Sequence, residues 1–179
     1  TPEAAAAALE SFDSPLVLIS GGSYKFLDLA EFGRAAARRA EVLVVTGEGR
    51  AFSTGADLKE SKTRTLEAYR EYLEELQEAS RKIIRFEKPT IAAVNGYAIG
   101  SGYELALACD IRIAAEEAQI GSPEAKVTSS VTGGAFRLVQ DLIGPGKAKE
   151  LLFTGDYIDG KQAQQIGLVN KAVPLEQLD

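Results

Sequence analysis

The stretch that decides the fold is Lys88-Pro-Thr-Ile-Ala-Ala-Val-Asn-Gly-Tyr-Ala-Ile-Gly-Ser-Gly-Tyr-Glu104. Its apolar run at residues 90–94 follows a proline and predicts a strand buried on both faces. The glycines at 100 and 102 predict a turn that opens a helix, whose first N–H groups have no helical acceptor. Glu104 lies on the first turn of that helix. Free amides beside a carboxylate suit chemistry in which an oxygen gains negative charge and a proton moves.

Strand and helix signals alternate on both sides of this stretch. Apolar runs predict strands at residues 16–20, 42–46, 90–94, 110–114 and 168–173. Three- and four-residue apolar spacing and proline or glycine boundaries predict helices at residues 27–39, 66–86, 102–108, 133–143, 145–152 and 161–166. Residues 47–57 are expected to form a glycine- and serine-rich loop. The alternation predicts an α/β fold, in one core domain over residues 1–179.

The composition excludes several kinds of chemistry. The chain has no histidine, so serine–histidine and cysteine–histidine nucleophiles and histidine-bound metals are excluded. Its one cysteine, Cys109, excludes an intrachain disulfide and a cysteine zinc site, and its apolar helical setting predicts a buried structural thiol. Acid–base work therefore falls to carboxylates, lysine or tyrosine.

Charge and hydropathy limit the partners and the compartment. The net charge of −6 and the absence of a basic stripe argue against nucleic-acid binding. No apolar run approaches the roughly 20 residues that cross a bilayer, and the N-terminus lacks the features of a signal peptide. We therefore expect a cytoplasmic protein that binds neither nucleic acid nor membrane.

Two glycine loops and a second acid stand out as candidate site elements. The loops cover residues 47–58 and 95–104, and each follows a predicted buried strand, where open α/β sheets place ligands. The second acid is Glu124, in Gly121-Ser-Pro-Glu124 after a short strand-like segment. Alone, each glycine loop is more often a structural turn, and each glutamate has an ordinary interpretation as a helix-start or loop acid. Together, the two glutamates become plausible acid–base partners.

Several segments, in the same order along the chain, resemble the enoyl-CoA hydratase/isomerase (crotonase) family. They are residues 52–60, 88–110, 121–124, 133–138, 148–155 and 163–170, and the resemblance covers about residues 42–173. Several ordered motifs are far more specific than one glycine pattern. The resemblance implies a crotonase-like spiral of ββα units and a homotrimer or a dimer of trimers. It also implies an acyl-CoA thioester as substrate, with no cofactor beyond this coenzyme A and no metal.

The resemblance also implies roles for individual residues. The backbone amides of Ala56 and Ser101 would form the oxyanion hole, and Glu104 and Glu124 would be the two catalytic acids. The presence of both acids favours hydration over isomerisation. The segment Ala56-Asp57-Leu58 would line the adenine pocket, and Lys59 would lie near the phosphates of the coenzyme. The full set of substrate-binding residues that we expect is Ser53, Gly55, Asp57, Leu58, Lys59 and Gly100.

The chain departs from the family's usual sequence in several places. Residues 20–27 replace a loop that usually contains Asn-Arg-Pro, and Val131-Thr-Gly133 replaces the common Pro-Gly-Gly. Ser101 replaces the family's usual glycine, a change that need not abolish an oxyanion hole made of backbone amides. Both Ser101 and Tyr103 beside Glu104 could narrow the acyl pocket. The chain stops at Asp179, so we expect the family's C-terminal helical region to be missing or truncated.

Three functions follow as hypotheses. The first is an acyl-CoA lyase that hydrates a 2-enoyl-CoA through an enolate held by the oxyanion hole. The second keeps the fold and changes the chemistry, to an isomerase, a decarboxylase or a hydrolase of a specialised acyl-CoA. The third is a non-catalytic acyl-CoA-binding or scaffold subunit, which the altered N-terminal segment and the missing C-terminal cover suggest.

Overall fold

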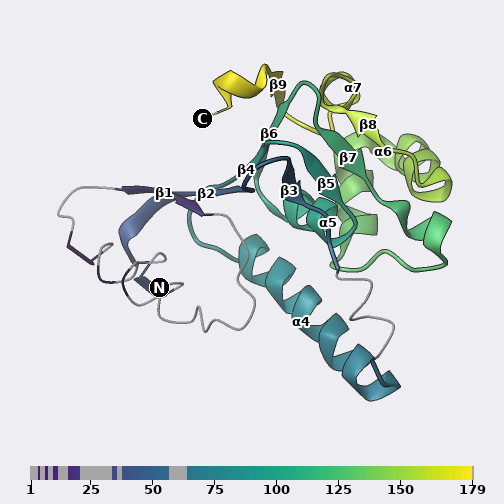
Figure 1. The fold of residues 1–179 in the computed structure, drawn as a ribbon, viewed down its shortest axis with the longest axis horizontal. Coiled ribbons are helices and arrows are strands. Elements are labelled where there is room, and N and C mark those ends of the chain that lie inside the picture. The colour runs from purple at the N-terminus through teal and green to yellow at the C-terminus, as the bar shows by residue number, and fades with distance from the viewer. Residues whose placement is uncertain are drawn as a thin grey trace.

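The computed structural model has the predicted α/β architecture (Figure 1). It describes residues 38–56 and 64–178, the strand Leu16–Ser20, and single positions 4, 7, 10, 11, 34 and 35. Most of the helix predicted at residues 27–39 lies outside the described residues. Within the part of the chain that is described, no helix has the length and apolar character needed to cross a membrane.

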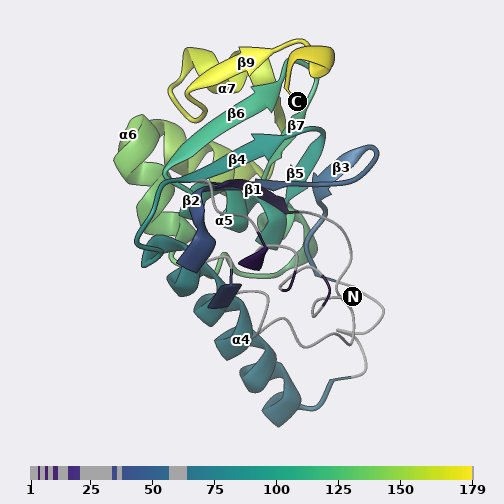
Figure 2. The same ribbon diagram turned by 90° about the vertical axis from the view of Figure 1, so that its left-hand side faces the viewer.

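The strands form two sheets (Figure 2). The first has five parallel strands, in the order β1 (Leu16–Ser20), β2 (Ala40–Thr46), β4 (Thr90–Val94), β6 (Ile111–Ala115) and β9 (Lys171–Val173). The second has the order β3 (Ala51–Ser53), β5 (Tyr97–Ile99), β7 (Gln119–Gly121) and β8 (Ile158–Asp159). Among the described strands, only the β7–β8 pair is antiparallel.

A repeated ββα unit generates both sheets. In each repeat one strand joins the first sheet, the next joins the second sheet, and a helix follows. The units are β2-β3-α4 (Leu66–Ile84), β4-β5-α5 (Ser101–Ala108), and β6-β7 with the 3-10 helix η1 (Pro123–Val127) and α6 (Ala135–Thr154). The chain then runs through β8, α7 (Gly160–Gln165), β9 and the short 3-10 helix η2 (Leu175–Gln177). This repetition is the spiral that the resemblance implied.

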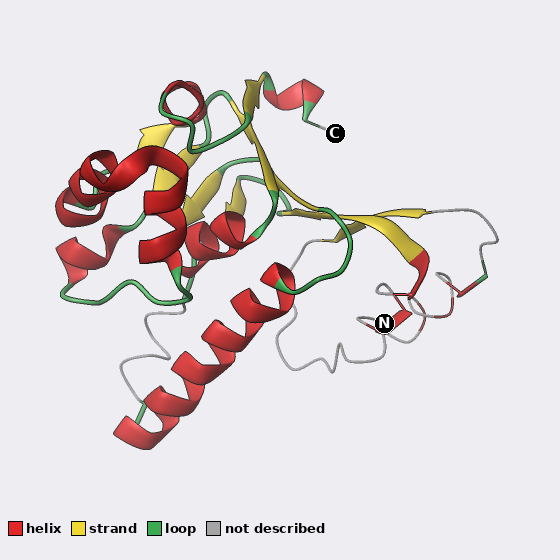
Figure 3. Ribbon diagram, turned by 180° about the vertical axis from the view of Figure 1, so that it is seen from behind, coloured by secondary structure: helices red, strands yellow, loops and turns green. Residues whose placement is uncertain are grey.

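Local sequence signals set the helix boundaries. The side chain of Thr65 caps α4 by accepting a hydrogen bond from the amide of Ala68 at 3.2 Å. Figure 3 shows α4 extending away from the sheets. Gly144 has φ 76° and ψ 160°, which interrupts α6 before Pro145 and agrees with the two helices predicted there. Asp159 and Gln162 form a capping box that starts α7.

Several strands differ from the sequence prediction. Residues 47–57 are not all loop, because β3 lies within them, and β5 lies inside the stretch predicted as one glycine turn. Each has three residues, which is too short to show the alternation by which a strand is recognised. The predicted strand at 168–173 is also shorter, since pairing with β6 begins only at Lys171.

The side chains of Cys109 and Arg112 lie in the interior. Cys109 is 3% exposed and its pKa is raised to about 11 by burial, so the prediction of a structural thiol is confirmed. The guanidinium of Arg112 donates to the carbonyls of Leu168 at 3.0 Å and Cys109 at 2.5 Å. It thereby joins the end of α5 to the segment before β9, because an arginine fork can reach several carbonyl acceptors at once.

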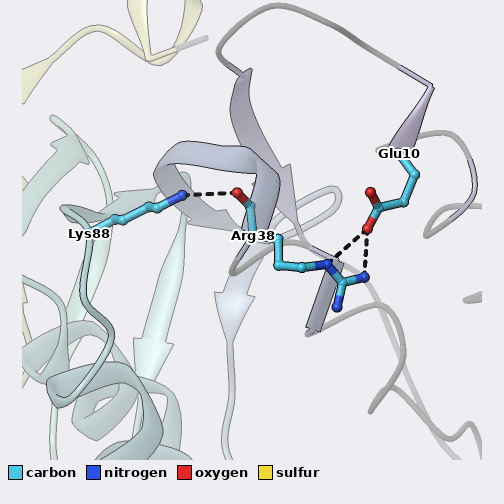
Figure 4. Close-up of polar contacts among 3 residues, drawn as sticks. All are labelled: Glu10, Arg38 and Lys88. Carbon is cyan, nitrogen blue, oxygen red and sulfur yellow. Dashed lines mark hydrogen bonds and ion pairs between the residues drawn. The ribbon is translucent and has the colours of Figure 1, made fainter.

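A surface ion pair links the N-terminal region to the first sheet (Figure 4). Arg38 donates to Glu10 Oε1 from Nε at 3.1 Å and from Nη2 at 2.6 Å. The Arg38 carbonyl accepts from Lys88 Nζ at 3.4 Å, two residues before β4 begins. The side chains of Arg38 and Glu10 are exposed, so we expect their ion pair to contribute less than about 1 kcal/mol to stability.

Two helical glycines give a matched test of how closely α5 packs. A Cβ at Gly102 would lie 2.2 Å from the Ser53 carbonyl oxygen, whereas a Cβ at Gly146 in α6 would meet nothing within 4 Å. We expect Gly102→Ala to destabilise the protein by about 2 kcal/mol or more, because backbone must move. Gly146→Ala should stabilise it by about 0.5 kcal/mol. Urea unfolding measures both; equal effects would contradict the close approach of β3 and α5.

Candidate active site

The candidate site lies at one edge of the second sheet. β3, β5 and β7 are parallel neighbours, so their carboxyl ends lie at the same edge. The pairs Ser53↔Ala98 and Ile99↔Gly121 set the register, and the amide of Gly100 donates to the Gly121 carbonyl at 3.2 Å. Residues 53–56, 100–101 and 122–124 therefore emerge side by side, where open sheets bind ligands.

The backbones of residues 55–56 and 101 are close to each other. Gly55 has φ 79°, and a Cβ there would lie 2.9 Å from the Ile99 carbonyl oxygen and 3.1 Å from the Ser101 amide nitrogen. Ser101 is the first residue of α5, after Gly100 with φ 59° and ψ −126°. No acceptor within the described chain takes the amide hydrogen of Ala56 or Ser101. The amides of Ala56 and Ser101 thus belong to backbone segments that contact each other at Gly55.

Glu104 is buried on the first turn of α5. It is 4% exposed, and both of its oxygens accept hydrogen bonds from Thr132. The Thr132 amide donates to Oε1 at 2.5 Å and the hydroxyl donates to Oε2 at 2.7 Å. Burial raises the pKa of Glu104, the Thr132 hydrogen bonds oppose that rise, and the negative charge of Glu124 adds to it.

Glu124 lies next to Gly100, the residue before Ser101. It is on the first turn of η1 and is partly buried. A Cβ at Gly100 would lie 3.0 Å from Glu124 Oε1, which places this carboxylate next to the residue before Ser101. The buried hydroxyl of Ser122 donates to Glu124 Oε2. Both glutamates are therefore held by a neighbouring hydroxyl group.

The structure collects most of the predicted site residues at this edge. The predicted residues in the described chain are Ser53, Gly55, Ala56, Gly100, Ser101, Glu104 and Glu124. Asp57, Leu58 and Lys59 lie outside the described residues. The Ser53 hydroxyl accepts from the Gly55 amide at 3.4 Å, so it supports the turn that precedes Ala56. The roles of all these residues in catalysis and substrate binding stay predictions.

Two site residues were missed in the sequence. Ser122 is two residues before Glu124, so a search for hydroxyl groups near the acids would have found it. Thr132 lies 28 residues from Glu104, and no local pattern connects them. Among the described residues, no three His, Cys, Asp or Glu side chains gather as a metal-ligand set.

The raised pKa of Glu104 gives a stability prediction. The folded state binds this proton more tightly than the unfolded chain, whose pKa is near 4.5. The contribution to stability is present below that value and is lost as the pH rises through the folded pKa. Unfolding free energy from urea titrations should therefore fall less between about pH 4 and pH 8 in Glu104→Gln than in the wild type. The exposed Glu117→Gln controls for loss of a charge; parallel curves for wild type and Glu104→Gln would contradict the prediction.

Comparisons with known proteins show which family this chain resembles. A family model described as enoyl-CoA hydratase/isomerase matches residues 32–179. The chain is 44% identical over 139 residues to a crotonyl-CoA hydratase of Syntrophomonas wolfei, a match that covers 77% of this chain and 54% of that protein. It is 45% identical over 138 residues to a probable mitochondrial enoyl-CoA hydratase of Dictyostelium discoideum, covering 76% of this chain and 48% of the relative.

A solved structure gives the same result for the fold. The crystal structure of an enoyl-CoA hydratase from Bacillus anthracis superposes with a TM-score of 0.82 at 34% identity, covering 94% of this chain and 70% of that one. The crotonase-like fold predicted from the sequence is thereby confirmed. The chain spans about half the length of the curated relatives it matches. The chain belongs to the enoyl-CoA hydratase/isomerase family.

Proposed function

We propose that the protein adds water reversibly to a 2-enoyl-CoA thioester. The observation that carries this proposal is the position of Glu104 and Glu124 around the amides of Ala56 and Ser101. A thioester oxygen gains negative charge when its α-carbon becomes enolate-like, and two fixed N–H donors stabilise that charge. The Syntrophomonas relative is named a crotonyl-CoA hydratase, which supports the same reaction class.

Each acid has one role in this reaction. Glu104 orients a water molecule and takes its proton as the oxygen bonds to Cβ. Glu124 gives a proton to Cα as the enolate collapses, and the reverse transfers accompany dehydration. The amides of Ala56 and Ser101 hold the enolate oxygen between these steps. The two acids thus need different protonation states at the start: Glu104 must be ionised to take the proton of water, and Glu124 must carry the proton that it gives to Cα. Burial raises the pKa of Glu104 and opposes its ionisation, whereas the two hydrogen bonds from Thr132 favour the ionised form.

The rest of the assignment is proposed on the resemblance to the family. Asp57 and Leu58 would line the adenine pocket, Lys59 would lie near the phosphates, and the protein would assemble as a homotrimer or a dimer of trimers. Isomerisation, decarboxylation or hydrolysis of an acyl-CoA is the second candidate. The presence of two acids at the amide pair favours hydration over these, and mass spectrometry of the products from a panel of acyl-CoA thioesters separates them.

The glutamates give the direct test of the function. Each proton-transfer group contributes about a hundredfold or more to rate, so Glu104→Gln and Glu124→Gln should each lower kcat for crotonyl-CoA hydration by at least that factor. Loss of the enoyl absorbance measures the rate, and calorimetry with coenzyme A checks that binding is kept. Glu117→Gln, on an exposed turn, should leave both unchanged. Full rates in both site variants would remove the proposed mechanism, and binding without turnover in the wild type would favour a non-catalytic subunit.

The amide of Ser101 gives an independent test. Position 101 is the first residue of α5, where helices accept proline because that amide has no helical partner. Ser101→Pro therefore removes the donor while keeping the helix start, and kcat should fall about 100- to 1000-fold. Ser101→Ala keeps the amide and should keep the rate within about threefold. Similar rates for the proline and alanine variants would show that this amide does not stabilise the enolate.

A further inference from the structure

We propose that Thr132 is a positioning residue for Glu104, and that its amide and hydroxyl fix the direction in which this carboxylate faces the reacting water. The inference rests on the proposed function and goes beyond the two acids and two amides. One residue supplies a donor to each oxygen of the carboxylate, at 2.5 and 2.7 Å. The carboxylate cannot rotate about its last bond without breaking both hydrogen bonds.

The loop that carries Thr132 is pressed against Glu104. Gly133 has φ 57°, and a Cβ there would lie 2.9 Å from Glu104 Oε2 and 2.9 Å from the Ser80 hydroxyl oxygen of α4. On its other side, the Thr132 carbonyl accepts from the amide of Ala135, the first residue of α6. The backbone of Thr132 is thus held between the start of α6 and the buried acid.

Because Glu104 is buried, its ionised form depends strongly on these two hydrogen bonds from Thr132. Its 4% exposure leaves little access for water to replace a lost donor. α5 packs against α4, α6, β3 and β5, and the group that α4 presents at this point is the uncharged hydroxyl of Ser80. Among the described residues, Glu124 on η1 is the charged group whose field reaches Glu104, and no basic side chain forms an ion pair with it. Thr132 is therefore the main support of the ionised form.

The position of Thr132 in the sequence adds a second consequence. It lies eight residues after Glu124, and residues 125–130 between them are exposed. The segment that follows Glu124 therefore leads to Thr132, which donates both hydrogen bonds to Glu104. Thr132 sets the placement of Glu104 relative to Glu124, so a change at this residue should alter proton transfer more than substrate binding.

Three variants separate a positioning role from a structural one. Thr132→Val keeps the shape and the amide but removes the hydroxyl, Thr132→Ser keeps both donors, and Thr132→Ala serves if the valine variant does not fold. The first readout is a carbon-13 NMR titration of the Glu104 carboxyl group, assigned by its absence in Glu104→Gln. The second is the pH profile of kcat/KM for crotonyl-CoA with the full chain.

We expect the valine variant to change ionisation and turnover together. Loss of a donor to the carboxylate should raise the pKa of Glu104, and the acidic limb of kcat/KM should move to higher pH because the base is ionised only above that pKa. kcat should fall about tenfold with KM changed less than about twofold, as for one lost hydrogen bond to a charged group. Thr132→Ser should restore both the titration and the profile.

The outcomes distinguish this inference from the proposed function. If Thr132→Val titrates Glu104 at the wild-type pH and keeps the wild-type profile, the positioning role is wrong, even if the variant is less stable. If the wild type does not hydrate enoyl-CoA thioesters, the proposed function fails. The NMR titration would then still show whether Thr132 sets the ionisation of Glu104.

Discussion

The parallel pairing of β3, β5 and β7 is the constraint on which the rest of the structure depends. These strands have three residues each, yet their register places the ends of three ββα units at one sheet edge. The amides of residues 56 and 101 and the carboxylate of Glu124 all come from the segments that follow these strands. The close contact of Gly102 with the Ser53 backbone allows this pairing, since any larger residue would separate β3 from α5.

Electrostatics at the site depends on the burial that this packing creates. Glu104 lies in the interior with no cation beside it among the described residues, so its charge depends on donors that the fold supplies. Thr132 provides two donors from the loop before α6, and Ser122 provides one to Glu124 from the end of β7. The two glutamates therefore differ in exposure and in hydrogen-bond partners.

Much of the fold could be predicted from the sequence because long elements carry their own signals. The apolar runs at β2 and β4, the start of α4 at Leu66 and the Gly144-Pro145 interruption of α6 all depend on neighbouring residues, and each was predicted near its observed place. The strands β3 and β5 were missed, because three residues hold too little periodicity and their stability comes from pairing with distant strands. The candidate acids were found because each follows a glycine- or proline-marked turn.

The sequence by itself was enough to identify the family, the α/β class and Glu104 and Glu124 as candidate catalytic acids, because these depend on ordered motifs and local propensity. Only the tertiary structure decided what those glutamates contact. Thr132 reaches Glu104 across 28 residues, and Gly100 reaches Glu124 across 24, through a sheet register that no local pattern encodes. The physical reason is that the ionisation of a buried carboxylate depends on the donors and charges that surround it in space, whatever their separation along the chain.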